Sequence, residues 1–168
     1  MTVIAGFTVG KTCAIASDSA MFEVDKDGGH TGIWWPANSP KVWRSGGFLL
    51  GGAGSTGPTV LAEESELGDP LKLVAFLKDR KDSISADADW EIMVVHRRGL
   101  WIIWQDFVVE RMKLNYHASG GASSPALGAL AVSKKLKLSP LAAVRLAAQA
   151  SCDHNISARP PVVSIEIK

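Results

Sequence analysis

The second residue of the chain carries a hydroxyl group that could act as a nucleophile. Thr2 follows Met1 directly, and a residue this small allows an aminopeptidase to remove the methionine. Removal would give Thr2 a free α-amine, whose ordinary pKa of about 7.7–8.0 suits a proton acceptor near neutral pH. One residue would then supply both a nucleophile and its base. A Met-Thr start is common in proteins, so other residues must support this chemistry.

Several familiar catalytic and cofactor motifs are missing from the sequence. It has no Walker loop, G-x-S-x-G motif, H-E-x-x-H motif or dinucleotide fingerprint, and the run GGAGSTG lacks the Lys-Ser/Thr pair of a phosphate loop. The four histidines are dispersed along the chain. Cys13 and Cys152 have neither metal-ligand nor redox spacing, so free thiols are expected. The sequence therefore predicts no metal site and no cofactor.

Length and charge narrow the class of protein. The 168 residues, 46% of them hydrophobic, suit a single domain over residues 1–168 with a substantial core. A net charge of +1 gives no reason to expect nucleic acid or an anionic membrane as a partner. Lys11 and Asp18 interrupt the first apolar run, so no secretory signal is predicted. The uncharged residues 45–62 are too rich in glycine for a membrane span, and a cytoplasmic protein is expected.

Apolar and β-branched runs between turn residues predict the strands. Residues 3–9 and 12–17 should form a hairpin around Gly10 and Lys11. Further strands are predicted over residues 41–44, 48–51, 90–96, 100–106 and 162–167, with one more ending near His117. Residues 23–40 contain a Gly-Gly pair, two prolines and adjacent tryptophans, which predicts an excursion with a flexible tip.

Four helices complete the expected elements. The first helix is predicted to start at Ser55, and the other three to cover residues 70–80, 124–137 and 139–151. Hydroxyl groups or prolines lie near several of the helix starts. The predicted order along the chain is therefore a group of strands, two helices, a second group of strands, two more helices and a final strand. This order predicts a layered protein in which pairs of helices cover both faces of stacked sheets.

Five segments, taken in chain order, resemble the proteasome β-subunit family of N-terminal nucleophile hydrolases, and HslV-like members most closely. The segments are MTVIAGFTVGKTCAIASDSA, SPKVWRS, FLLGGAGS, HASGGASSPALGAL and AAQASCDHN. The resemblance extends over nearly the whole chain. It implies an α+β fold, a four-layer αββα sandwich, and catalysis by an N-terminal threonine.

The resemblance also implies roles for individual residues. Thr2 would attack the peptide carbonyl while its own amine takes the proton. Lys41, kept charged by Asp18, would lower the pKa values of the Thr2 hydroxyl and amine. The N–H of Gly51 would stabilise the oxyanion. Ser119 would orient the α-amine.

The sequence departs from the family pattern in several places, one of them the Ala in place of the more usual Gly before Ser119. The family has an Asp followed three residues later by a Ser; Asp153 matches the Asp, but Ile156 occupies the Ser position and Ser157 lies one further on. The interval between Asp18 and Lys41 is longer than in HslV and carries GGHTGIWWP. This insertion could cover the site, contact a neighbouring subunit or bind a partner.

The same alignment implies an apolar substrate pocket that favours cleavage after hydrophobic side chains. Its residues would be Met21, Ser39, Trp43, Leu49 and Ala53. Trp43 and Leu49 could equally be ordinary core residues.

Together these features predict a threonine-type endopeptidase that cleaves unfolded polypeptides after Met1 is removed. The resemblance further implies a ring homo-oligomer, in one or more stacked rings, and a AAA+ unfoldase as a partner. Two alternatives stay open. One is an N-terminal nucleophile amidase acting on a small amide, and the other is a catalytically silent, proteasome-like structural subunit.

Overall fold

The computed structural model describes residues 2–19, 21–24, 30–34, 41–155 and 158–168. The strands are β1 (Ile4–Val9), β2 (Thr12–Ser17), β3 (Met21–Val24), β4 (His30–Trp34), β5 (Val42–Ser45), β6 (Phe48–Gly54), β7 (Trp90–His96), β8 (Gly99–Trp104), β9 (Val109–Arg111), β10 (Tyr116–Ser119) and β11 (Val163–Ile167). The α-helices are α1 (Thr56–Glu64), α2 (Pro70–Asp79), α3 (Ser123–Lys135) and α4 (Pro140–His154).

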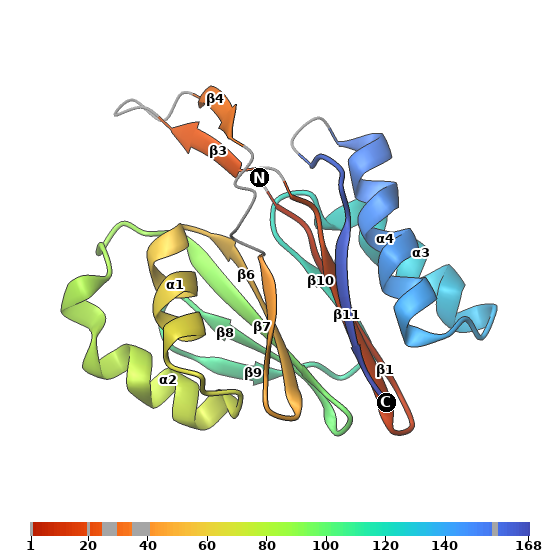
Figure 1. Ribbon diagram of the computed structural model, residues 1–168, viewed down its shortest axis with the longest axis horizontal. Coiled ribbons are helices and arrows are strands. Elements are labelled where there is room, and N and C mark those ends of the chain that lie inside the picture. The colour runs from red at the N-terminus through yellow and green to blue at the C-terminus, as the bar shows by residue number, and fades with distance from the viewer. Residues whose placement is uncertain (1, 20, 25–29, 35–40, 156–157) are drawn as a thin grey trace.

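Two antiparallel sheets face each other in the middle of the molecule. One has the strand order β10-β1-β2-β11 and the other β5-β6-β7-β8-β9, while β3 and β4 form a separate two-stranded sheet. Figure 1 shows α3 and α4 on the outer side of the four-stranded sheet and α1 and α2 on the outer side of the five-stranded sheet. The predicted αββα sandwich is therefore confirmed.

The alternation of side chains along each strand produces three layers of core. In β1, Ala5 and Phe7 pack toward α3 and α4, while Ile4 packs between the sheets. In β7, Met93 and Val95 join the layer between the sheets, and the residues that alternate with them pack toward α1 and α2. Because both faces of these strands are largely buried, their sequences are mostly apolar and do not alternate regularly with polar residues.

The two sheets approach each other closely. A Cβ atom placed on Gly6 would lie 2.7 Å from Met93 Sδ and 2.9 Å from Leu100 Cδ2. A larger residue in this position would push the sheets apart. This tight packing keeps the ends of the two sheets, and the residues they carry, in a fixed relation.

Two of the helices have well-defined N-terminal caps. The Asp69 side chain accepts hydrogen bonds from the N–H groups of Leu71 and Lys72 at the start of α2. The Ser139 hydroxyl accepts one from the N–H of Ala142 at the start of α4. Each cap precedes a proline, which suits the first position of a helix because it needs no N–H there.

Most predicted elements are present, with ends shifted by a few residues. The excursion predicted for residues 23–40 is in part regular, because β4 pairs with β3 in an antiparallel hairpin; its expected tip lies outside the described residues. The strand predicted for residues 100–106 ends earlier, and the short β9 was not predicted. Three residues are too few to give a periodic pattern.

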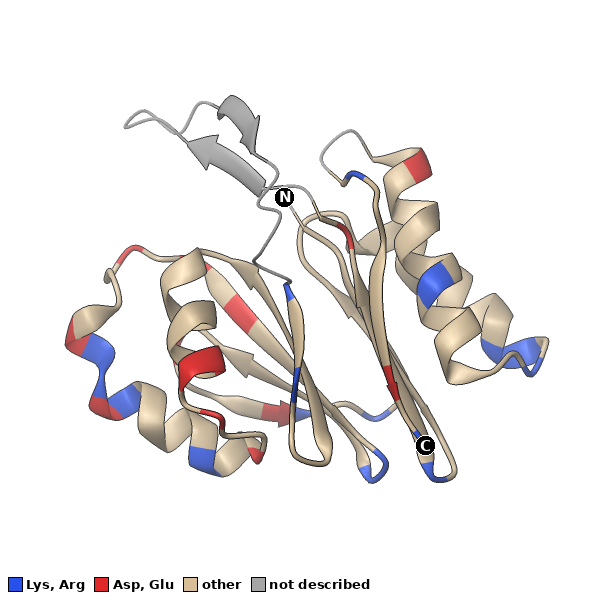
Figure 2. Cartoon of the chain, viewed as in Figure 1, with Lys and Arg blue, Asp and Glu red and all other residues tan. Residues whose placement is uncertain are grey.

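Charged side chains gather on the helices and at the hairpin turns, whereas the strands are mostly free of them (Figure 2). No helix within the described ranges has the length and apolar content needed to cross a membrane.

Candidate active site

Three residues predicted to be catalytic lie at strand ends that meet at one end of the two sheets. Thr2 lies just before β1, Asp18 follows the last residue of β2, and Lys41 lies just before β5. The antiparallel pairing of Ile4 with Ser17 places the start of β1 beside the end of β2. The β-hairpin thus brings together two residues 16 positions apart in the sequence, and sheet stacking adds Lys41.

The Lys41 ammonium group connects the other two side chains. Lys41 Nζ lies 2.9 Å from Thr2 Oγ1 and 2.9 Å from Asp18 Oδ1. Asp18 is fully buried and Lys41 is 6% exposed, so the ion pair is shielded from water. The backbone of Lys41 is held as well, because its carbonyl accepts a hydrogen bond of 3.0 Å from the N–H of Gly52.

Backbone groups from both ends of the chain stabilise the Asp18 carboxylate. The N–H of Val3 donates to Oδ1 at 3.1 Å, and the N–H of Arg159 donates to Oδ2 at 3.4 Å. A buried carboxylate requires such donors, since the loss of hydration is otherwise costly. Asp18 is therefore fixed beside Lys41 by contacts from three parts of the chain.

Burial lowers the pKa of Lys41 below the ordinary value of 10.5, and the charge and hydrogen bond of Asp18 act in the opposite direction. A cation in contact with the Thr2 hydroxyl favours its deprotonated form. This arrangement can therefore activate Thr2 as a nucleophile.

The backbone of Thr2 is held by the turn that follows β10. The N–H of Ala122 donates to the Thr2 carbonyl oxygen at 3.2 Å. A Cβ atom on Gly120 would lie only 2.1 Å from that oxygen, and Gly120 has a φ of +89°. Only glycine fits this position without strain. The turn therefore determines where the Thr2 carbonyl lies.

Ser119 lies in this same region. It is the last residue of β10, is 5% exposed and pairs with Ile4 of β1. Next to it, the N–H of Gly120 donates to Oε1 of Glu91 at 2.6 Å. Burial raises the pKa of Glu91, while the hydrogen bond from the Gly120 N–H opposes this shift. Among the described residues, the buried Ser119 hydroxyl has no hydrogen-bond partner.

Gly51, the predicted oxyanion donor, is a buried residue of β6 in register with Val42 of β5 and Met93 of β7. A Cβ atom here would lie 2.7 Å from Ile4 Cγ2 and 3.1 Å from Val42 Cγ1. Gly51 thus lets β6 pass close to Ile4, the first residue of β1. Its role in catalysis stays a prediction.

The residues predicted to form the substrate pocket have different environments. Ala53 is buried near Gly120, with its Cβ atom 3.5 Å from the position of a Gly120 Cβ. Leu49 is fully buried between the sheets, and Trp43 packs in the layer toward α1 and α2. Ser39 and the side chain of Met21 lie outside the described residues.

The hydrogen bond given for Asp153 does not connect it to Thr2, Asp18 or Lys41. It is exposed near the end of α4 and accepts a hydrogen bond of 2.7 Å from Gln149. Ile156 and Ser157 lie outside the described residues. Within the described part of the chain, no group of three or more potential metal-ligating side chains is present.

Glu91, Gly120 and Ala122 were not identified from the sequence. Two signals pointed to them. The Gly-Gly pair after Ser119 is typical of a turn with unusual backbone angles. Glu91 occupies a strand position two residues before Met93, so it shares that residue's inward face. A carboxylate on an inward face is uncommon enough to suggest a specific partner.

Comparison of this chain with known proteins finds similar solved structures but no similar sequence. No protein-family model matches the chain, and no curated protein matches its sequence. BPH from Thiobacillus denitrificans, in complex with epoxomicin, has a TM-score of 0.79 at 18% identity, covering 99% of this chain and 98% of that one. A second BPH structure has a TM-score of 0.74 at 21% identity, covering 99% and 97%.

HslV from Trypanosoma brucei is a further structural neighbour, with a TM-score of 0.73 at 14% identity over 99% of both chains. Identities this low establish a common fold rather than a common activity. The predicted resemblance is confirmed at that level: the chain has the fold of the HslV-like N-terminal nucleophile hydrolases.

Proposed function

We propose that this protein is a threonine-type peptidase of the HslV and proteasome kind, with Thr2 as its nucleophile. The observation that carries the proposal is the buried contact of Lys41 Nζ with both Thr2 Oγ1 and Asp18 Oδ1, at 2.9 Å each. The shared fold with HslV and BPH agrees with it. The mechanism requires that Met1 be removed, because the base is the α-amine that removal frees.

The reaction follows from this geometry. Thr2 Oγ attacks the peptide carbonyl carbon while the α-amine of the same residue accepts the hydroxyl proton. Lys41 stays positively charged beside Asp18 and stabilises the developing alkoxide. The N–H of Gly51 is proposed to stabilise the oxyanion of the tetrahedral intermediate. Ser119 is proposed to orient the α-amine. When the tetrahedral intermediate collapses, the peptide C–N bond breaks, the protonated α-amine gives its proton to the departing amine, and an acyl ester on Thr2 Oγ remains. Water, deprotonated by the α-amine, then hydrolyses this ester, which releases the carboxylic acid and restores the Thr2 hydroxyl.

Substrate choice and assembly belong to the same proposal. We propose unfolded polypeptides as substrates, cleaved after hydrophobic side chains in a pocket that includes Ala53. Met21, Ser39, Trp43 and Leu49 are the other proposed pocket residues, and Asp153 is proposed to support the site from α4. A ring homo-oligomer, served by a AAA+ unfoldase, would restrict access to unfolded chains.

The test is covalent labelling followed by intact-mass measurement. The BPH neighbour was solved with epoxomicin, and this compound should add once to the wild-type chain, on a species that has lost Met1. Thr2→Ala should take no label and should not cleave fluorogenic hydrophobic peptides. Thr12→Ala, which removes a threonine side chain elsewhere in the same hairpin, is the matched control and should keep both properties.

Each of the other outcomes would lead to a different conclusion about the function or about the nucleophile. Retention of Met1 in the purified native protein, with no adduct, would refute catalysis and leave a silent structural subunit. An adduct at Thr2 without peptide cleavage, but with hydrolysis of small amides, would indicate an amidase. Cleavage that survives in Thr2→Ala would show that the nucleophile is another residue.

A further inference from the structure

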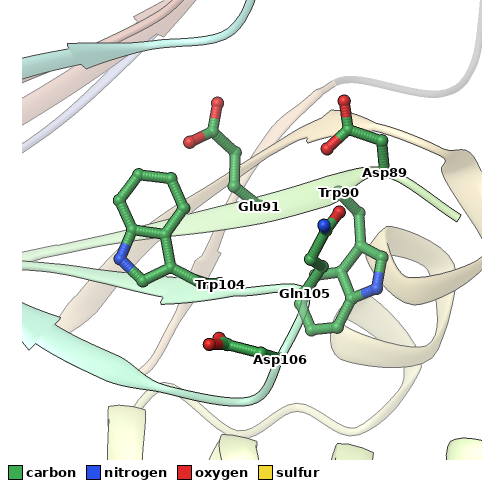
Figure 3. A pocket seen from close by; sticks show the side chains of 6 residues that line it. All are labelled: Asp89, Trp90, Glu91, Trp104, Gln105 and Asp106. Atoms are coloured by element: carbon green, nitrogen blue, oxygen red, sulfur yellow. The ribbon is translucent and has the colours of Figure 1, made fainter.

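Glu91 is a carboxylate on the inward face of the five-stranded sheet. It is the second residue of β7, and the next residues on the same face, Met93 and Val95, are fully buried between the two sheets. Its neighbour Trp90 points the other way, into the layer under α1 and α2. Figure 3 shows Glu91 and Asp89 on one side of the strand and Trp90 on the other. Glu91 therefore lies where the apolar layer between the sheets reaches the candidate site.

The carboxylate links one sheet to the turn that ends the other. The N–H of Gly120, which follows β10, donates to Glu91 Oε1 at 2.6 Å, across 29 positions of sequence. Ala53, the strand partner of Glu91 on β6, lies against the same glycine. A backbone N–H that donates to a carboxylate makes a charge-assisted hydrogen bond, which is stronger than one between neutral groups.

The turn that Glu91 contacts also holds the proposed nucleophile. Gly120 approaches the Thr2 carbonyl oxygen so closely that a Cβ atom would not fit, and the N–H of Ala122 donates to that oxygen at 3.2 Å. Ser119, the last residue of β10, immediately precedes Gly120 in the chain. A displacement of Gly120 would therefore reach both Ser119 and Thr2.

We propose that Glu91 is a positioning residue of the candidate site, whose carboxylate holds the turn of residues 119–122 in the place where it fixes Thr2 and Ser119. The proposal rests on the proposed function, because positioning matters only if Thr2 reacts. Glu91 acts through Gly120 and does not touch the reacting atoms. Catalysis tolerates small displacements poorly, and an error of about 1 Å in the position of a nucleophile can cost about 100-fold in rate.

The surroundings of Glu91 make the test practicable. The side chain borders a cavity of about 480 Å³ that is also lined by Asp89, Trp104, Gln105 and Asp106 (Figure 3). A truncated side chain would be replaced by water there rather than by a collapsed core. We therefore expect Glu91→Ala to fold.

The experiment compares three variants of the full-length protein. Glu91→Ala removes the acceptor, Glu91→Gln keeps an oxygen that can accept from Gly120, and Asp89→Ala removes a neighbouring exposed carboxylate as the control. Peptidase kinetics give kcat and KM separately. Hydrogen exchange, followed by mass spectrometry on a peptide that covers residues 118–123, reports on the turn without requiring activity.

Glu91→Ala should lower kcat by at least about tenfold, with little change in KM, and should speed exchange in residues 118–123. Glu91→Gln should restore most of both properties, and Asp89→Ala should match the wild type. Should Glu91→Ala not fold, Glu91→Asp, which withdraws the acceptor by one methylene group, takes its place and should lower kcat in the same way.

Two results would overturn the proposal. One is wild-type kcat and wild-type exchange in Glu91→Ala, and the other is a Glu91→Gln variant as impaired as Glu91→Ala. A wild type without Thr2-dependent cleavage would instead overturn the proposed function. In that case, unchanged hydrogen exchange in Glu91→Ala would show that the contact of Glu91 with Gly120 does not hold the turn either. Faster exchange would show that this contact holds the turn but has only a structural role.

Discussion

At the scale of single residues, the buried pair of Lys41 and Asp18 allows the proposed catalysis and the stability of the fold to be tested together. Lys41→Met should lower kcat by at least about 100-fold, because the Thr2 hydroxyl loses its neighbouring cation. It should also lower the free energy of unfolding by about 3–5 kcal/mol, since Asp18 keeps a buried charge without its cation. Peptidase kinetics and urea denaturation measure the two effects on the same sample. Lys11→Ala, on the exposed hairpin turn, is the control.

Removing both charges separates these two effects. The double variant Asp18→Asn/Lys41→Met should regain most of the lost stability, because no unpaired buried charge is left. The new amide side chain would still offer an oxygen to the Val3 N–H. Activity should not return. A double variant no more stable than Lys41→Met would show that the pair contributes through something other than its charges.

The pH dependence of Lys41 provides a second test at this scale. Burial lowers its pKa, so the ammonium should lose its proton, and kcat should fall, at a pH below the ordinary value of 10.5. Between the lowered pKa and 10.5 the unfolded chain binds more protons at this group than the folded one. The contribution of Lys41 to stability therefore rises with pH across that window.

As the pH rises through this window, kcat should therefore fall while the contribution of Lys41 to stability rises. This difference distinguishes deprotonation of Lys41 from alkaline unfolding of the protein. Rate and urea-unfolding measurements from neutral pH to pH 10.5 would show it. Lys41→Arg, which stays charged throughout, should keep whatever activity it has over the alkaline range. An identical alkaline fall in Lys41→Arg would assign the titration to another residue.

At the scale of structural elements, the turn after β10 leaves no room for a side chain at Gly120. Gly120→Ala would place a methyl group 2.1 Å from the Thr2 carbonyl oxygen in a backbone with φ of +89°. The left-handed backbone alone costs about 1–2 kcal/mol, and the contact adds to it. We expect a loss of stability of more than about 2 kcal/mol, measured by thermal and urea unfolding, together with a loss of Thr2 reactivity toward epoxomicin.

A matched glycine in α3 provides the comparison. A Cβ atom on Gly128 would meet nothing within 4 Å, and this residue lies in the helix interior. Gly128→Ala should therefore stabilise the protein by about 0.5–1 kcal/mol and leave its activity unchanged. A Gly120→Ala variant as stable as Gly128→Ala would show that the Gly120 turn can move away from Thr2.

At the scale of the whole molecule, the packed layers shield both thiols. Cys13 lies between the sheets, and Cys152 is a buried residue of α4 that packs in the layer between the helices and the four-stranded sheet. Burial raises the pKa of both thiols, that of Cys152 to about 11. Neither thiol should react with iodoacetamide in the native protein at neutral pH. Intact mass should show no label before guanidinium is added and two labels after. Labelling of Cys152 in the native state would show that α4 separates from its sheet.

The layers could be predicted because each strand and helix carries its own local pattern. The order of elements gave the sandwich, and the five resembling segments gave Thr2, Asp18 and Lys41, which the fold brings together. Contacts such as Glu91 with Gly120 could not be predicted, since they depend on how the ends of two sheets meet. Single-residue roles for Gly51 and Asp153 depend on a bound substrate or on assembly, which no local pattern encodes.

The contacts of Asp18 have a consequence for the timing of activity during synthesis. The carboxylate receives hydrogen bonds from the N–H of Val3, just before β1, and from the N–H of Arg159, shortly before β11. A chain of which only the residues before Arg159 have left the ribosome lacks the second of these contacts and also β11. Such a chain holds Asp18, and with it Lys41, less firmly. Under the proposed function, Thr2 would therefore become fully reactive only after β11 has joined its sheet.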